Sequence, residues 1–232
     1  MNMTLEESRL SPQEMTSRPD AVLHPQLPNK MARIVILALE EVLGRNGLNA
    51  ILNLARLPHF IGHYPPADFS GGVAFAQISA LLAAVDEMYG PRGGRMLALR
   101  AGRVCFKHGI RDFGGLVGLA DVALRFLPLN VRARLGLEVL MEILNQHSDH
   151  RVRLEITEDA YLLVMERCSV CWQRQTSYPA CALVVGLLQE ALYWIGGGYF
   201  FAVEEIACRA QGADACIFQV DKVRSGERGD HA

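Results

Sequence analysis

Three cysteines and one glutamate in the last third of the chain constrain its fold more than any other feature. Cys181, Glu205, Cys208 and Cys216 are separated by 23, 2 and 7 residues. Each is expected where a helix begins, a strand ends or a hairpin turns. Thiolates with one carboxylate can complete the tetrahedron of a structural zinc site. The spacing therefore suggests a metal centre, and the alternative is a set of small core residues, because free cysteine is among the most buried residue types.

Glu205 and Cys208 also restrict the shape of the strand that carries them. Side chains three residues apart on a regular strand point to opposite faces. The strand must therefore curl or bulge near Cys208, or Glu205 must reach around its edge. Gly212 in the following turn allows the backbone to reverse, so that Cys216 returns toward Cys208.

Cys168 and Cys171 form a CxxC pair. Such pairs occur in zinc ribbons and in thioredoxin-like redox sites. A redox pair should open a helix after a strand, whereas this one ends the second strand of an expected hairpin. The pair could instead supply an alternative zinc ligand, because it lies only ten residues before Cys181. Cys105, between two apolar neighbours in an expected helix, is favoured as a core residue.

The same C-terminal residues carry a resemblance to a known family. From roughly Arg151 to Val220 the chain resembles the 4-vinyl-reductase domain, and the features that carry the resemblance are Cys181, Gly186, Gly196 to Gly198 and the run from Glu205 to Phe218. The resemblance implies one zinc ion held by Cys181, Glu205, Cys208 and Cys216. It also implies a fold shared with haem-dependent nitric-oxide sensors and with subunits of the Golgi tethering complex, built around an apolar ligand cavity.

Members of this family occur as free-standing proteins and as sensor domains of aromatic-responsive transcription activators. In the phenol-sensing relatives, a His and a Trp upstream of the first zinc cysteine contact the ligand hydroxyl. The same offsets lead here to Arg132 and Ala160, so that pair does not carry over.

Length and composition favour a single domain. A chain of 232 residues with 50% hydrophobic residues and a mean hydropathy of +0.14 can bury a substantial core. No linker-like stretch interrupts residues 29–222, so one ligand-binding domain is expected there, with its zinc-binding part at 151–220. The polar, proline-containing segment 1–28 is expected to be a flexible arm, and residues 223–232 a flexible tail.

Charge and hydropathy exclude several classes of partner. A net charge of −2 and an isoelectric point near 6.4 give no general attraction for nucleic acid or acidic lipid. The apolar stretches are too short for a membrane span. The polar N-terminus lacks a secretion signal, which favours a cytoplasmic protein whose thiols are reduced and available to a metal.

Hydrophobic periodicity predicts helices first and strands afterwards. Apolar residues at helical spacing predict helices at 29–44, 48–55, 74–88, 95–111, 114–126 and 131–145. From Arg151 the pattern alternates, which predicts a hairpin of two strands, 151–157 and 160–166, with its turn at Glu158 and Asp159. A crossover helix is predicted at 179–195, followed by a second hairpin of strands 199–208 and 216–221. The expected fold class is α+β, with an N-terminal helical half packed on a four-stranded antiparallel sheet and one crossover helix.

Histidines and aromatic residues offer weaker candidates. His59 and His63 fall in a segment rich in proline and glycine that is expected to be a loop, so a metal site there is not favoured. Candidate ligand-pocket residues are Phe106, His108, Trp172 and Trp194. Such residues usually form core, yet pockets for planar apolar ligands are lined in the same way.

No catalytic constellation, dinucleotide fingerprint or phosphate loop is recognisable in the sequence. This absence favours binding over turnover, and with the resemblance it makes zinc-stabilised binding of a small hydrophobic ligand, aromatic or tetrapyrrole, the expected function. The resemblance also implies a homodimer paired through helices, which are expected within residues 29–90, where the helices are apolar over much of their circumference. An enzyme or accessory protein for 4-vinyl reduction of a tetrapyrrole in bacteriochlorophyll synthesis is one alternative, as the family name implies. A protein-interaction scaffold is the other.

Overall fold

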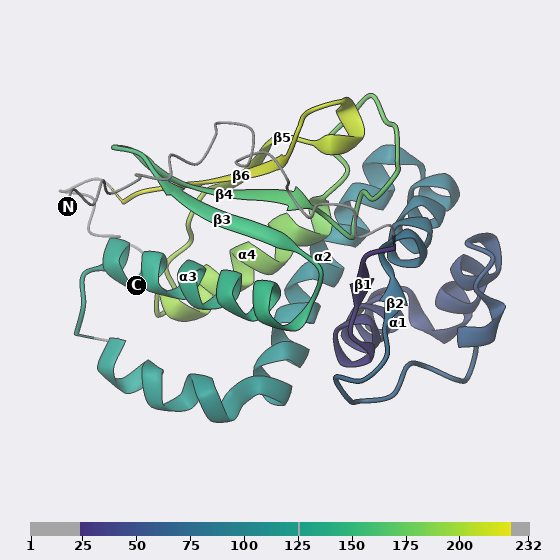
Figure 1. Ribbon diagram of the computed structural model, residues 1–232, viewed down its shortest axis with the longest axis horizontal. Coiled ribbons are helices and arrows are strands. Elements are labelled where there is room, and N and C mark those ends of the chain that lie inside the picture. Colours follow the sequence, from purple (N-terminus) through teal and green to yellow (C-terminus); the bar gives the residue numbers. More distant parts are fainter. Residues whose placement is uncertain (1–23, 125, 224–232) are drawn as a thin grey trace, which may run out of the picture.

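An antiparallel sheet organises the C-terminal half of the chain in this computed structural model, which describes residues 24–124 and 126–223. Its strands follow the order β3-β4-β6-β5, with bounds β3 (Arg151–Ile156), β4 (Ala160–Arg167), β5 (Val203–Ala207) and β6 (Cys216–Asp221). Helices α3 (Leu129–His147) and α4 (Ala182–Ile195) lie along one face of this sheet (Figure 1). The α+β class predicted from the sequence is confirmed.

Two glycines break the helices of the N-terminal half where the sequence predicts breaks. Helix α1 (Asn29–Leu54) is interrupted at Gly44 and α2 (Phe75–Leu124) at Gly90, each with φ of 72°, a left-handed conformation that favours glycine. After Gly90, α2 continues without a break to Leu124. The predicted boundary between helices 95–111 and 114–126 is therefore wrong, because two adjacent glycines lower helix propensity without requiring a break.

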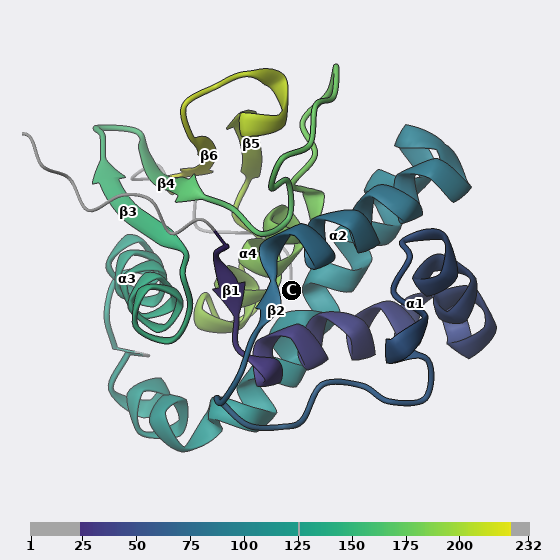
Figure 2. The same cartoon turned by 45° about the vertical axis from the view of Figure 1, so that its right-hand side comes forward.

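A small second sheet was not predicted. Strand β1 (Gln26–Leu27) pairs with β2 (Val73–Ala74), which joins the start of α1 to the start of α2. Residues 1–23 of the arm expected at 1–28, and residues 224–232 of the tail expected at 223–232, lie outside the described residues. Figure 2 shows α1 beside α2, with the small sheet at their ends. None of the described helices is both long and apolar enough to cross a membrane.

Helices α2 and α4 cross in close contact because each contributes a glycine. A Cβ atom on Gly102 would lie 2.0 Å from the carbonyl oxygen of Leu183, and one on Gly186 would lie 2.0 Å from that of Leu99. Any side chain at these positions would push the helices apart. The crossing fixes α4, the crossover helix, against the helical half.

A bulge at Ile206 explains how Glu205 and Cys208, three residues apart, can both be buried. Glu205 pairs with Phe218 and Ala207 with Ile217, so two steps along β5 match one step along β6. The bulge leaves Ile206 half exposed and both Glu205 and Cys208 buried. Gly212, with φ of 96°, then turns the chain toward β6. The strand predicted at 199–208 is shorter than expected and begins at Val203.

Candidate metal centre and ligand cavity

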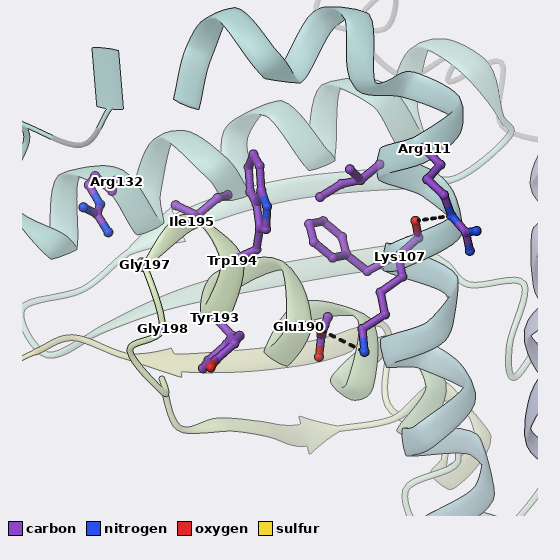
Figure 3. Close-up of a pocket in the computed structure, with 11 residues that line it drawn as sticks. Lys107, Arg111, Arg132, Glu190, Tyr193, Trp194, Ile195, Gly197 and Gly198 are labelled. Atoms are coloured by element: carbon purple, nitrogen blue, oxygen red, sulfur yellow. Dashed lines mark hydrogen bonds and ion pairs between the residues drawn. The ribbon is translucent and has the colours of Figure 1, made fainter. Parts of the chain in front are cut away.

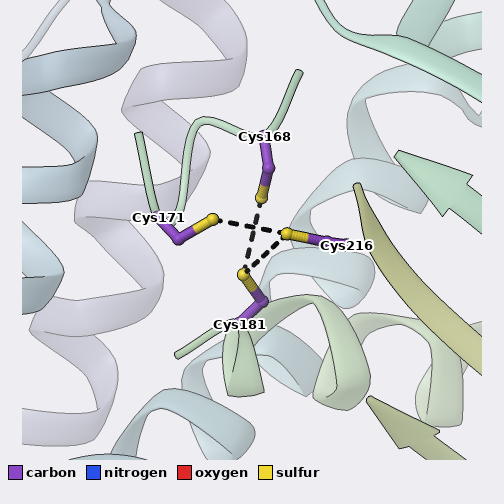
Figure 4. Close-up of side chains that lie close together, drawn as sticks. All are labelled: Cys168, Cys171, Cys181 and Cys216. Carbon is purple, nitrogen blue, oxygen red and sulfur yellow. Dashed lines mark hydrogen bonds between the residues drawn. The ribbon is translucent and has the colours of Figure 1, made fainter. Parts of the chain in front are cut away.

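Five buried thiols and one buried carboxylate meet where the two hairpins and α4 converge. We call this set the thiol cluster, and its members are Cys168, Cys171, Cys181, Glu205, Cys208 and Cys216. Cys168 and Cys171 follow β4, Cys181 immediately precedes α4, and Cys216 begins β6. Figure 4 shows these four cysteines pointing toward one another from three separate elements.

Distances between the sulfur atoms match those of a four-coordinate metal site. The Sγ atom of Cys181 lies 3.6 Å from that of Cys168, 3.7 Å from that of Cys216 and 3.9 Å from that of Cys208. The Sγ atoms of Cys171 and Cys216 are 3.4 Å apart. A tetrahedral ion with metal–sulfur bonds of about 2.3 Å holds its sulfurs roughly 3.8 Å apart. All five cysteines are free thiols, and these spacings suit zinc ligation.

The ligand atoms form two overlapping sets of four. The structure brings together the predicted set of Cys181, Glu205, Cys208 and Cys216, with ligand atoms within 4.8 Å of one another. The other set consists of Cys168, Cys171, Cys181 and Cys216, under the same limit. The sequence contained the signal for the second set in its CxxC spacing, which indicated one alternative ligand rather than a complete site.

Backbone amides donate hydrogen bonds to several members of the cluster. The Cys181 amide donates to Oε2 of Glu205 at 2.9 Å, and the Ala180 amide donates to Sγ of Cys208 at 3.5 Å. The Arg209 amide donates to Sγ of Cys216 at 3.4 Å. Such donors stabilise thiolate and carboxylate, the forms that bind metal.

Glu205 has one oxygen that the protein leaves unsatisfied. Its Oε1 atom is buried and has no hydrogen-bond partner among the described residues. Burial, followed by the neighbouring Cys208, raises the pKa of Glu205 to about 8. A buried acceptor without a partner is costly, and a metal ion bound at this oxygen would remove that cost.

A cavity of about 180 Å³ lies between the helical half and the sheet. Its walls come from β1, α1, α2, α3, β4 and α4 and are almost entirely apolar, with Val35, Ile110, Leu144, Leu163 and Leu188 among the lining residues. The polar side chains among the described lining residues are His150 and Ser169, apart from the Cys105 thiol. The space therefore suits an apolar ligand with at most one hydrogen-bonding group.

His150 is held neutral in the wall of this cavity. Its Nδ1 atom lies 2.7 Å from Oγ of Ser148 and its Nε2 atom 3.0 Å from Oγ of Ser169. Burial lowers the pKa of His150 to about 4. Sequence reasoning did not single out His150, because a lone histidine before a strand carries no spacing signal.

The thiol cluster and the cavity share a loop and a helix. Cys168 and Cys171 belong to the cluster, whereas Ser169 and Val170, between them, line the cavity. Cys181 likewise stands directly before α4, whose residues Leu183, Val184, Leu187 and Leu188 line the same cavity. An ion bound in the cluster would therefore fix two walls of the cavity.

The four aromatic and histidine candidates do not gather in one pocket. Phe106 lines both the cavity and a neighbouring open groove of about 990 Å³, and Trp194 lines only the groove, 6.3 Å from Phe106 between ring centroids (Figure 3). His108 lies outside both spaces, on the side of α2 that meets α1, where its Nε2 atom is 3.2 Å from Oε2 of Glu41. Trp172 lies beside the CxxC loop, in edge contact with Phe75.

Comparison with solved structures identifies the fold. An H-NOX protein from S. oneidensis in its Fe(II)NO ligation state is 12% identical, with a TM-score of 0.52, and the match covers 82% of this chain and 99% of that one. An unliganded Fe(II) H-NOX protein from K. algicida is 14% identical, with a TM-score of 0.52, covering 85% and 100%. The chain has the fold of H-NOX domains. No protein-family model and no curated protein matches the sequence.

A haem does not fit the cavity of this chain. Pockets for ligands of drug size occupy about 300–1,000 Å³, and the cavity holds about 180 Å³. Both ring nitrogens of His150, the histidine among its described lining residues, already face serine hydroxyls. The residues present therefore do not provide a haem site in this cavity.

Proposed function

We propose that this protein is a binding domain for a small apolar molecule, such as a single aromatic ring, and that zinc bound in the thiol cluster stabilises the ligand site. The observation that carries the proposal is the apolar cavity, with its single polar pair of His150 and Ser169, directly beside the cluster. The resemblance to the 4-vinyl-reductase domain, whose sensor members bind zinc and aromatic ligands, supports the same function.

The cavity volume supports a ligand of about one ring. An apolar cavity of about 150 Å³ is known to bind benzene, and this one has about 180 Å³. Burying roughly 200 Å² of apolar ligand surface at about 25 cal/mol per Å² gives on the order of 5 kcal/mol before association costs. A net free energy of about 5 kcal/mol would correspond to a Kd of roughly 0.2 mM, which is the tightest binding that this burial allows, since association costs weaken it. A hydroxyl on the ring could donate a hydrogen bond to Oγ of Ser169, which has acceptor capacity beyond its contact with His150.

The proposed role of zinc is structural. Four protein ligands leave no open coordination position, whereas catalytic zinc sites normally keep one for water. The cytoplasm, as a reducing compartment, would keep the thiols available to the metal. The ion would hold the CxxC loop and the start of α4, and through them the cavity walls.

The tetrapyrrole alternative requires a larger space than the cavity offers. A tetrapyrrole ligand would instead have to occupy the open groove beside Trp194. The scaffold alternative gains no support from a molecule that contains a cavity of this kind. Binding of a small ligand is therefore the function that the geometry supports best.

A titration with three probes tests this function. Toluene, phenol and a free-base porphyrin are added to zinc-loaded protein, and binding is followed by calorimetry and by tryptophan fluorescence. The expected result is saturable binding of toluene and phenol, with phenol at least as tight as toluene. Binding of the porphyrin alone, or of no probe with a Kd below about 1 mM, would contradict the proposal.

We also propose that the chain forms a homodimer through helices within residues 29–90. Exposed large apolar side chains in this region support the pairing, namely Leu54, Phe69, Met88 and Tyr89. Light scattering at tens of micromolar is expected to give twice the chain mass of 25.6 kDa. A mass equal to that of one chain would rule out the pairing.

A further inference from the structure

The thiol cluster contains more ligands than one tetrahedral ion can use. An ion in the set that contains Glu205 leaves the thiols of Cys168 and Cys171 unused, although their sulfurs lie within 3.6 Å of ligating sulfurs. An ion in the all-cysteine set leaves Oε1 of Glu205 buried without a described partner. Either single-ion arrangement therefore leaves two buried ligand groups idle.

We propose that the thiol cluster holds two divalent ions of the zinc type, bridged by the thiolates of Cys181 and Cys216. Cys168 and Cys171 complete the coordination of one ion, and Glu205 and Cys208 complete that of the other. The proposal rests on the zinc binding of the proposed function and adds a second ion that the family resemblance does not imply. Cys181 and Cys216 take the bridging positions because they alone belong to both sets.

The spacing of the bridging pair is compatible with two tetrahedra that share an edge. The Sγ atoms of Cys181 and Cys216 are 3.7 Å apart. With metal–sulfur bonds of about 2.3–2.4 Å, two ions on opposite sides of this edge lie roughly 3 Å from each other. The terminal thiols are already at ligand spacing, since Cys168 and Cys208 lie 3.6 and 3.9 Å from Cys181.

Charge balance is compatible with a second ion. One divalent ion bound by three thiolates and a carboxylate leaves a net charge of −2, since the two unused thiols stay protonated, and two ions bound by five thiolates and a carboxylate leave the same net charge. The amides of Ala180, Cys181 and Arg209 donate hydrogen bonds to three of the ligand groups and stabilise this charge.

The second ion has a route to its site. A small pocket of about 190 Å³ opens beside Cys168 and Cys171 and is lined by Trp172, Arg174 and Arg209. A metal site requires such an entry path. The CxxC side of the cluster therefore borders a pocket in the folded protein.

Metal stoichiometry and metal–metal coupling test the proposal. The full chain is loaded with zinc under reducing conditions, and bound zinc is counted by native mass spectrometry; a second sample is loaded with cadmium-113 for NMR. The expected result is two ions per chain and two cadmium resonances that split each other through the shared sulfurs. One ion per chain, or two resonances without mutual splitting, would overturn the bridged pair.

Variants assign each ion to its ligands. The double substitution Cys168→Ser and Cys171→Ser is expected to lower the count from two to one, and so is the pair Glu205→Gln and Cys208→Ser. Cys105→Ser, outside the cluster, should keep both ions. A count unchanged by the CxxC substitutions overturns the second site, and the wild-type cadmium spectrum decides the question if a variant does not fold. Toluene binding is measured separately, so a failed ligand function is distinguishable from a failed second ion.

Discussion

The thiol cluster and the cavity are both buried and share a loop, yet they tolerate change differently. In the cluster, six ligand atoms from separate elements have to meet at fixed distances. In the cavity, apolar side chains from six elements only have to enclose a volume. Loss of a ligand common to both sets of four leaves neither set complete, whereas apolar walls can repack. We therefore expect stability to depend mainly on the cluster, and ligand choice mainly on the cavity.

Removing a ligand common to both metal sets should have the largest effect. Cys181→Ser should release the metal and lower the free energy of unfolding by at least about 3 kcal/mol, because metal binding and folding are coupled. For a chain of this size, that loss lowers Tm by roughly 6–12 °C. Calorimetry and zinc analysis provide the readouts.

The matched control is Cys105→Ser, a buried cysteine outside the cluster whose pKa is raised to about 12 by burial. It should keep the full metal content. Equal destabilisation of the two variants, with zinc retained in both, would show that Cys181 is an ordinary core residue and not a zinc ligand.

Acid should destabilise the protein through the cavity wall. The pKa of His150 falls from 6.5 to about 4 on folding, so the unfolded chain binds a proton in that window and the folded chain does not. Stability therefore decreases as pH falls from about 6.5 to 4, by on the order of 3 kcal/mol.

His150→Gln keeps hydrogen-bonding groups beside both serines but cannot titrate. As pH falls over the same range, the free energy of unfolding of the variant should decrease less steeply than that of the wild type, and the difference in slope should correspond to about one bound proton. Because metal loss at low pH affects both proteins, the difference between their denaturation curves isolates His150. Parallel curves would show that His150 is not held neutral by burial.

Forcing α2 and α4 apart should destabilise the thiol cluster and the cavity together. Gly186→Ala would place a Cβ atom 2.0 Å from the Leu99 carbonyl oxygen, and we expect a loss of about 1–3 kcal/mol. Gly109→Ala, where nothing lies within 4 Å of the new Cβ atom, should be neutral or stabilising. Urea denaturation distinguishes the two, and equal midpoints would contradict close packing at Gly186.

Filling the cavity should have the smallest effect on stability and a clear effect on binding. Leu187→Phe adds volume to the lining and should weaken toluene binding at least tenfold, while zinc content stays unchanged. Val139→Phe, on the exposed side of α3, is the matched control. Undiminished toluene binding by the Leu187 variant would place the ligand elsewhere.

The sequence predicted the cluster far better than the cavity, for a physical reason. Cysteines are rare, and their spacing with Glu205 required a local distortion that the bulge at Ile206 supplies. Helix breaks at Gly44 and Gly90 were likewise predictable, because a left-handed residue favours glycine.

The cavity left no such pattern. Its lining consists mainly of common apolar residues from six elements, and these are indistinguishable in sequence from solid core. His150 becomes distinctive only when Ser169 is brought to it from 19 residues away. The β1–β2 pair was missed because two-residue strands have no period, and aromatic crowding did not locate the cavity.

Toluene affinity with and without metal tests most directly whether the cluster supports the cavity. Calorimetric titrations are run on zinc-loaded protein, on protein stripped by a chelator and checked for folding by circular dichroism, and on protein reloaded with zinc. We predict a submillimolar Kd for loaded protein, at least tenfold weaker binding after stripping, and recovery on reloading. Equal affinity in folded protein without metal would contradict the account.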